Sequence, residues 1–295
     1  FIGGSGFIGK SFIDFFNRGL LKKYKIKKVN ILCRHPKKLK SNSKINLKKV
    51  RVIKADISKI KNLPLSDVII YAAESTDGNA YKNKNLITKK HKAAIDNFCK
   101  LVEKNKKSKI LYISSGSVSQ KFKINKSSSN YKQLYSQLKK YSEYKIKELK
   151  KNKIKTSIAR CYTFIGPWIP LRKHYAIGSF IYDGFYKKYI EVKSNKKVFR
   201  SFMYSDDLID WLCKIASTSN YTCPTYNVGS NKQIEIRKLA LIIGKIFNKP
   251  VKFKKYFNTK IDKYVPNIDK TKRDLKLRIN YDLIQSINLT INQIN

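Results

Sequence analysis

Residues 1–9 read Phe1-Ile2-Gly3-Gly4-Ser5-Gly6-Phe7-Ile8-Gly9, which joins a short apolar run to glycines at positions 3, 6 and 9. The apolar residues that follow recur with helical periodicity, at Phe12, Ile13, Phe15 and Phe16. This order predicts the end of a β-strand, a tight glycine turn and the start of an α-helix.

The spaced glycines have separate physical tasks in a turn that binds a dinucleotide. Gly3 permits the turn, Gly6 lets the backbone approach a pyrophosphate, and Gly9 lets the helix pack closely on the sheet. The N-terminus of the helix offers N–H groups and a partial positive charge to the phosphates. Spacing alone also fits an ordinary turn. The candidate cofactor-binding residues of this loop are Gly3, Ser5, Gly6, Phe7, Ile8 and Gly9.

The string from Gly3 to Gly9 resembles the cofactor loop of the extended short-chain dehydrogenase/reductase family, the NAD-dependent epimerase/dehydratases that act on nucleotide sugars. The resemblance implies an α/β fold, a Rossmann-type doubly wound parallel sheet with a smaller C-terminal mixed α/β substrate lobe. We expect an NAD(P)-binding domain at 1–165 and an interleaved substrate-binding lobe at 166–295. Family members usually carry several more residues before the glycines, so we expect a truncated first strand. The resemblance also implies a homodimer.

Composition places the chain among globular proteins, because 42% of its 295 residues are hydrophobic. No apolar run approaches the ~20 residues that a membrane span needs, and no signal peptide is visible. The five cysteines are scattered and form no Cys-x-x-Cys pair, so we expect neither a disulfide framework nor a metal site. A reducing cytoplasm fits this use of cysteine best.

The net charge of +46 invites a nucleic-acid-binding interpretation. The lysines are spread over the whole chain, however, whereas nucleic-acid-binding proteins concentrate basic and aromatic residues on one face. We therefore interpret the charge as a solvated surface that attracts anionic substrates such as nucleotide diphosphates.

The first half of the chain alternates predicted strands and helices at the spacing of βαβ units. An apolar strand at 29–33 leads directly into Arg34, where dinucleotide-binding folds carry the residue that faces the adenosine ribose. An acidic residue there suits the 2′-hydroxyl of NAD, whereas Arg suits the 2′-phosphate of NADP. Arg34 therefore favours NADP over NAD, and the alternative is that it is one more surface cation.

Two later strands supply further cofactor-binding residues by resemblance. After the strand at 50–57, Asp56 and Ile57 match the family residues that hold the adenine ring. The strand at 67–73 ends in Ala72 and Ala73, which resemble the small residues beneath the nicotinamide ribose. The polar segment 74–85 is expected to form a loop beside the active site.

A serine and a Tyr-x-x-x-Lys pair form the candidate catalytic site. A strand at 109–113 leads to Ser115, and Tyr135 and Lys139 lie one turn apart on a predicted helix. A phenol has an unperturbed pKa of ~10, and a neighbouring ammonium favours the phenolate and lowers that pKa. By resemblance, Ser115 binds the substrate oxygen and Lys139 reaches the ribose hydroxyls. Tyr135 moves a proton while hydride moves to or from the nicotinamide.

A second Tyr-x-x-x-Lys, formed by Tyr141 and Lys145, leaves the choice of pair open. Tyr135/Lys139 is favoured because family members carry Glu four residues after the Lys, as Glu143 does here. The interval from the candidate serine is shorter than usual, which favours Tyr141/Lys145 instead. Either pair could also be an ordinary charged surface of a helix.

One departure from the family pattern reduces the number of reactions that the resemblance allows. The 4,6-dehydratases place an Asp-Glu pair directly after the catalytic hydroxyl, and this chain has Gly116-Ser117 there. Because that pair does the acid and base work of water elimination, its replacement argues against dehydration. Ketone reduction and epimerisation remain.

The second half of the chain carries the residues expected around the substrate. The segment 160–167 resembles the family segment that passes the nicotinamide, with Tyr162 at the cofactor and Thr163 where the family has Asn. Arg200, in a segment that resembles Arg-x-Phe-x-Tyr-x-x-Asp-Leu, has a planar fork that suits a diphosphate. His174 is expected to have a surface or capping role. The candidate substrate-binding residues are Ser117, Thr163, Arg200 and Tyr204.

Three functions are open at this point. The leading hypothesis is NADP-dependent reduction of a 4-keto nucleotide sugar. The second is a nucleotide-sugar 4-epimerase that retains NAD and reverses its own oxidation. The third is a non-catalytic, basic dinucleotide-fold protein that binds RNA, which would not need Tyr135 and Lys139.

Overall fold

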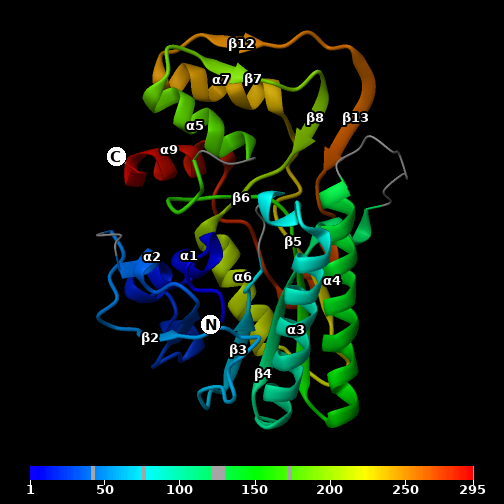
Figure 1. Ribbon diagram of the computed structural model, residues 1–295. Coiled ribbons are helices and arrows are strands. Elements are labelled where there is room, and N and C mark those ends of the chain that lie inside the picture. Colours follow the sequence, from blue (N-terminus) through cyan, green and yellow to red (C-terminus); the bar gives the residue numbers. More distant parts are fainter. Residues whose placement is uncertain (41–43, 75–77, 121–129, 172–174, 295) are drawn as a thin grey trace. The chain divides into compact units, whose positions relative to one another are not determined.

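The computed structural model describes residues 1–295 apart from 41–43, 75–77, 121–129, 172–174 and 295 (Figure 1). The chain divides into two compact units. The first consists of Phe1–Cys161 and Ile209–Val228, and the second of Tyr162–Leu208 and Gly229–Asn295. The expected roles of the two parts, cofactor binding and substrate binding, stay a prediction.

A parallel sheet forms the centre of the first unit. Its strands are β1 (Asn30–Cys33), β2 (Arg51–Lys54), β3 (Val68–Tyr71), β4 (Lys109–Ser115), β5 (Lys155–Cys161) and β10 (Thr225–Val228). Ile2 joins its two parts through parallel bridges to Leu32 in β1 and Tyr71 in β3. The resulting order, β2-β1-Ile2-β3-β4-β5-β10, is that of a Rossmann-type doubly wound sheet and confirms the predicted α/β fold class.

Helices cover both faces of this sheet, because its central strands are apolar on both faces. Ile110, Leu111 and Tyr112, which are consecutive in β4, are all fully buried. Helices α3 (Lys84–Glu103) and α4 (Asn130–Glu148) lie side by side (Figure 1) and share a core cluster with Tyr112. On the opposite face, Ser157 Oγ in β5 donates to a backbone oxygen of α6 (Ser205–Ser217), Ile215 O, at 3.3 Å.

The local sequence explains why α3 forms where it does. Its N-cap residue, Asn83, accepts a hydrogen bond from Leu86 N at 3.0 Å. Ile95, Phe98 and Val102 then recur at helical spacing and are buried. The smaller elements of the first unit are α1 (Phe7–Asn17), η1 (Lys22–Tyr24), α2 (Lys37–Lys40), η2 (Gly78–Tyr81), η3 (Gly116–Ser119) and η4 (Leu149–Asn152).

The second unit is built from short strands and four helices within its described residues. Strand β8 (Lys196–Arg200) pairs antiparallel with β11 (Ile234–Glu235) and parallel with β13 (Asn258–Tyr264). Phe185 and Phe247 meet edge to face at 4.8 Å between two of the helices. The remaining elements are β6 (Phe164–Ile165), β7 (Ile190–Val192), β9 (Met203–Tyr204), β12 (Val251–Phe253), α5 (Ala176–Tyr186), α7 (Ile236–Phe247), α8 (Asp269–Leu275) and α9 (Leu283–Ile294).

Three further findings concern the sequence-based expectations. His174, for which a surface or capping role was expected, lies outside the described residues, and α5 begins after it at Ala176. All five cysteines are buried thiols. Within the described ranges, no helix is both long and apolar enough to span a membrane.

Candidate active site

The glycine loop lies between Ile2 and α1, and two of its glycines are required by the protein's own packing. Gly3 has a φ of 100°, and a Cβ at this position would lie 2.6 Å from Ala72 O. At Gly9, a Cβ would lie 2.5 Å from the Cα atom of Gly4. The turn therefore needs Gly3, and the contact between α1 and the loop needs Gly9.

Gly6 differs from these two, because the space beside its backbone is open. A Cβ there would have Gly3 O, at 3.7 Å, as its nearest neighbour among the described atoms. Gly6 is the exposed N-cap residue of α1, and the first turn that follows, Phe7–Lys10, contains no acidic residue. The start of α1 therefore combines helix N–H groups and the positive end of the helix dipole with an open Cβ position at Gly6.

The other predicted cofactor-binding residues of this unit follow the carboxyl ends of neighbouring strands. Arg34 follows β1, Asp56–Ile57 follows β2, and Ala72–Ala73 follows β3. Because these strands are parallel and adjacent, the residues share one edge of the sheet with the glycine loop. Ala72 N donates to Ile2 O at 2.8 Å, which places Ala72 directly beside the loop.

Asp56 and Arg34 act on each other electrostatically at this edge. Ser58 donates to Asp56 Oδ1 from its backbone N at 3.0 Å and from its Oγ at 2.7 Å. Burial by itself would raise the pKa of Asp56, but these hydrogen bonds and the positive charge of Arg34 outweigh it and lower that pKa. Arg34 therefore lies near the residue expected at the adenine.

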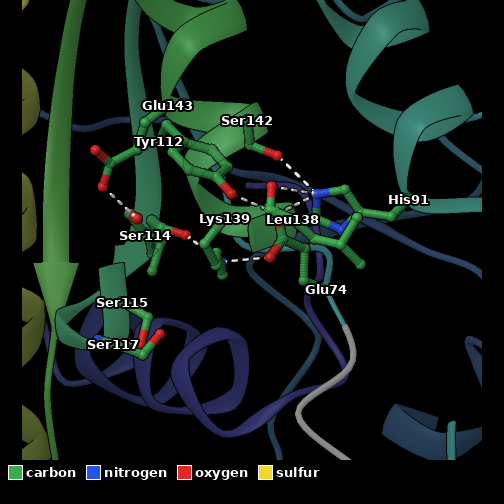
Figure 2. A network of polar contacts seen from close by, with 11 residues as sticks. Glu74, His91, Tyr112, Ser114, Ser115, Ser117, Leu138, Lys139, Ser142 and Glu143 are labelled. Atoms are coloured by element: carbon green, nitrogen blue, oxygen red, sulfur yellow. Dashed lines mark hydrogen bonds and ion pairs between the residues drawn. The ribbon is translucent and has the colours of Figure 1, made fainter. Parts of the chain in front are cut away.

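Lys139 is buried in α4, with 4% of the residue exposed, which is rare for a lysine. Its Nζ donates to Ile113 O at 2.7 Å and lies 2.5 Å from Glu74 Oε2 (Figure 2). The same Nζ lies 5.0 Å from the ring centre of Tyr112 and 5.8 Å from that of Tyr135. The structure thus brings together the Tyr135 and Lys139 side chains of the predicted pair.

The second pair on α4 has different surroundings. Tyr141 OH donates to Asp96 Oδ1 at 2.9 Å, and Lys145 Nζ lies 3.3 Å from the same oxygen. Asp96 belongs to α3, and the Lys145 side chain is 34% exposed. These contacts tie α4 to α3, which is a structural role.

The serines at and just after the end of β4 also separate into two groups. Ser114 Oγ donates to Glu143 Oε1 at 2.6 Å, and the same oxygen accepts from Arg160 Nε at 2.9 Å. This buried cluster ties β4, α4 and β5 together. Ser115 Oγ instead accepts from Ser117 N at 3.2 Å, where η3 begins. Ser117 Oγ is buried without a hydrogen-bond partner among the described residues.

Glu74 and His91 were not assigned from the sequence, although Figure 2 shows them in one network with Lys139. Glu74 Oε1 accepts from Tyr112 OH at 2.6 Å and lies 3.9 Å from His91 Nε2. His91 Nε2 also lies 2.7 Å from Ser142 Oγ and 3.1 Å from Leu138 O, of which only the hydroxyl can either donate or accept. The sequence signal that could have found Glu74 is its place directly after Ala72–Ala73.

Burial decides the charge state of this network. It lowers the pKa of His91 and, together with the charge of Glu74, raises that of Tyr112. Both groups are therefore neutral at neutral pH. The opposed charges in the network are those of Lys139 and Glu74.

The predicted site residues of the second unit are described within that unit alone. Tyr162 stacks on Tyr264 with ring centres 4.7 Å apart, and Thr163 Oγ1 donates to Ser201 O. One terminal nitrogen of Arg200 donates to Asp262 Oδ1 at 2.9 Å. Tyr204 is 2% exposed. The cofactor and substrate roles assigned to these residues stay predictions.

Comparison with known proteins places the chain in a class. The family model of the NAD dependent epimerase/dehydratase family matches residues 1–229, so the chain belongs to this family. It is a family of NAD-dependent nucleotide-sugar enzymes of the extended short-chain dehydrogenase/reductase type, as predicted. No curated protein sequence matches the chain.

Solved structures share the fold over 99% of this chain. Pal from Bacillus thuringiensis is 19% identical, with a TM-score of 0.78 over 97% of its own chain. UDP-glucose 4-epimerase from Thermotoga maritima, solved with UDP-glucose, is 14% identical, with a TM-score of 0.79 over 96% of its chain. The dTDP-glucose 4,6-dehydratase DesIV from Streptomyces venezuelae, solved with NAD, is 16% identical, with a TM-score of 0.80 over 95% of its chain. At these identities the likeness shows the fold.

Proposed function

We propose that this protein is an NADP-dependent oxidoreductase that reduces the 4-keto group of a nucleotide-diphosphate sugar with Ser115, Tyr135 and Lys139. The observation that carries the proposal is the burial of Lys139 beside the ring of Tyr135 in a chain of this family. Burying an ammonium has a high desolvation cost, so Lys139 needs compensating contacts. A role in proton transfer by Tyr135 would explain why a lysine is buried at this position.

The three residues divide the work of a ketone reduction. When bound, the nicotinamide supplies a hydride to the carbonyl carbon. Tyr135 gives its hydroxyl proton to the carbonyl oxygen, so that the C=O group becomes CH–OH. Ser115 donates a hydrogen bond to that oxygen and orients it. The ammonium of Lys139 stabilises the phenolate that Tyr135 becomes.

The residues along the sheet edge fit the dinucleotide that this reaction needs. The open space beside Gly6, at the start of α1, suits the pyrophosphate. Asp56–Ile57 would hold the adenine ring, and Ala72–Ala73 would lie beneath the nicotinamide ribose. Arg34 would bind a 2′-phosphate, which its guanidinium suits better than a bare 2′-hydroxyl.

Dehydration has less support. The residues after Ser115 are Gly116 and Ser117, neither of which can act as an acid or base at neutral pH. Two nearby buried carboxylates are already engaged, since Glu74 pairs with Lys139 and Glu143 with Arg160.

The second candidate is an NAD-retaining nucleotide-sugar 4-epimerase. It is favoured by the solved 4-epimerases that share the fold, among them the UDP-N-acetylglucosamine 4-epimerase from Methanobrevibacter ruminantium. With the same Ser115, Tyr135 and Lys139, Tyr135 would take the proton of the 4-hydroxyl and later return it, while retained NAD would accept the C4 hydride and give it back on the opposite face.

Calorimetric titration with NADPH and NADH separates the two candidates. We expect NADPH to bind the wild-type protein about tenfold to a hundredfold more tightly, because a charge-assisted contact contributes about 1.5–3 kcal/mol. Arg34→Ala should erase the difference, whereas Lys37→Ala, which removes a nearby exposed cation, should retain it. Equal binding of NADH, or NAD that stays with the purified protein, would favour the epimerase. Salt-sensitive RNA binding without dinucleotide binding would contradict both candidates.

A further inference from the structure

Glu74, which follows the carboxyl end of β3, contacts Lys139. Its side chain is 8% exposed, and its two oxygens have different partners. Oε2 lies 2.5 Å from Lys139 Nζ, and Oε1 accepts a hydrogen bond from the Tyr112 hydroxyl at 2.6 Å (Figure 2). The carboxylate is therefore held from β4 on one side and holds Lys139 on the other.

These contacts restrict where the ammonium can point. An ammonium has three donors. One of them donates to Ile113 O at 2.7 Å, and Glu74 Oε2 lies 2.5 Å from the same Nζ as its ion-pair partner. These two contacts hold Nζ in place and leave it a donor for a ribose hydroxyl.

The contacts also restrict the charge that Tyr135 experiences. The Lys139 ammonium lies 5.8 Å from the Tyr135 ring centre, and an isolated cation there would favour the phenolate strongly. A carboxylate 2.5 Å from that ammonium opposes the effect. Tyr135 therefore responds to an ion pair and not to a lone cation.

We propose that Glu74 is a positioning residue, which holds Lys139 in place and moderates the acidity of Tyr135 through it. The proposal rests on the proposed function, in which Tyr135 and Lys139 carry out the proton transfer. Glu74 itself touches neither substrate nor proton in transit.

Four other titratable groups around this pair are neutral at neutral pH, and Glu143, one turn after Lys139 on α4, is paired with Arg160. Burial raises the pKa of the tyrosines and of the thiol, to about 12 for Cys161, and lowers the pKa of the histidine. When Glu74 is replaced by a neutral residue, these four groups stay neutral. The change in charge therefore acts on Lys139 and Tyr135 without a compensating protonation nearby. These groups are Tyr81 on η2, His91 on α3, Tyr112 on β4 and Cys161 on β5.

The experiment measures the acidity of Tyr135 directly. A single 3-fluorotyrosine replaces Tyr135, and its pKa is followed by 19F NMR in the protein without added cofactor. We expect Glu74→Gln to lower this pKa by about 1, because removal of an anion favours the phenolate. Asp96→Asn is the matched control, since Asp96 holds Tyr141 and Lys145 on the same helix pair and should leave the pKa at position 135 unchanged.

The outcomes separate positioning from a merely structural role. A folded Glu74→Gln protein with an unchanged pKa at position 135, even with reduced thermal stability, would overturn the proposal. If Glu74→Gln does not fold, Glu74→Asp provides the test. The shorter side chain moves the carboxylate away from Lys139, so it should lower the pKa at position 135 by a smaller amount. No change in Glu74→Asp would then overturn it.

The measurement is independent of cofactor and substrate. A lowered pKa in a protein that binds neither NADPH nor NADH would contradict the proposed function and leave the role of Glu74 intact. Binding of NADPH with an unresponsive Tyr135 would support the proposed function and contradict the role of Glu74.

Discussion

Tyr135 and Tyr141 stand a turn and a half apart on α4 and face different partners. Tyr135 is half-buried beside the Lys139 ammonium and packs edge to face on Tyr81, with ring centres 6.0 Å apart. The Tyr141 hydroxyl donates a hydrogen bond to Asp96. A phenol bonded to a carboxylate is stabilised in its neutral form, and the pKa of Tyr141 is raised by burial and by Asp96. These contacts favour the neutral phenol of Tyr141.

Replacing each tyrosine with phenylalanine tests this difference. We expect Tyr135→Phe to reduce the single-turnover rate of NADPH oxidation with a 4-keto nucleotide sugar by about 10²–10⁴, the usual contribution of a general acid. Tyr141→Phe should retain most of the rate. The reverse result would make Tyr141/Lys145 the catalytic pair.

His91 couples protonation to stability. Burial lowers its pKa, so the unfolded chain takes up a proton more readily than the folded protein. The stability present above pH ~6.5, the unfolded value, is therefore lost as the pH falls. We expect urea midpoints measured from pH 7 to pH 5 to fall less steeply for His91→Gln than for wild type. The exposed His35, changed to Gln, should leave the slope unaltered.

In the turn between Ile2 and α1, one glycine is needed for packing within the protein, and another leaves room for a ligand. Gly3 is needed for packing, because its positive φ and the nearby Ala72 O exclude a side chain. Gly6 has room for a methyl group in the protein itself. A bound pyrophosphate would use that room.

Alanine at each position separates the packing role from the binding role. Gly3→Ala should destabilise the fold by about 1–3 kcal/mol, as strained backbone does. Gly6→Ala should cost less than about 1 kcal/mol at an N-cap and yet weaken dinucleotide binding about tenfold or more. Urea unfolding and calorimetry measure the two effects. A Gly6→Ala protein with wild-type affinity would show that no ligand approaches that position.

The whole molecule carries a formal charge of +46, with 65 basic residues against 19 acidic ones. Such an excess destabilises the compact state by self-repulsion and attracts anionic ligands. Several acidic residues are drawn into buried or half-buried ion pairs, such as Glu74 and Glu143. Most of the positive charge is therefore left to be screened by the solvent.

Added salt should stabilise this protein. At 0.5 M NaCl the screening length falls below the ~10 Å of 0.1 M salt, so repulsion between surface lysines weakens. We expect the thermal midpoint to rise by a few degrees between 20 mM and 0.5 M NaCl, while the association rate with nucleotide diphosphates falls. A midpoint that decreases with salt would mean that ion pairs outweigh the repulsion.

The sequence by itself determined the features that depend on neighbours along the chain. The glycine loop with α1, the alternation of strands and helices, the family and the Tyr-x-x-x-Lys spacing are of this kind, because local backbone geometry and helical periodicity follow from short stretches. The same local view favoured Tyr135/Lys139 and Ser115 but left Tyr141/Lys145 open as an alternative pair.

Only the tertiary structure decided what each of these side chains contacts. The sheet order brings the carboxyl ends of β3 and β4 together, and α4 packs beside them, so Glu74 meets Lys139 although the two are far apart in sequence. Ser114 faces Glu143, while Ser115 ends the strand. Likewise, β10 returns to pair with β5 in the first unit. The physical reason is that buried charges and paired strands interact according to their distance in space. The spacing of residues along the chain does not specify that distance.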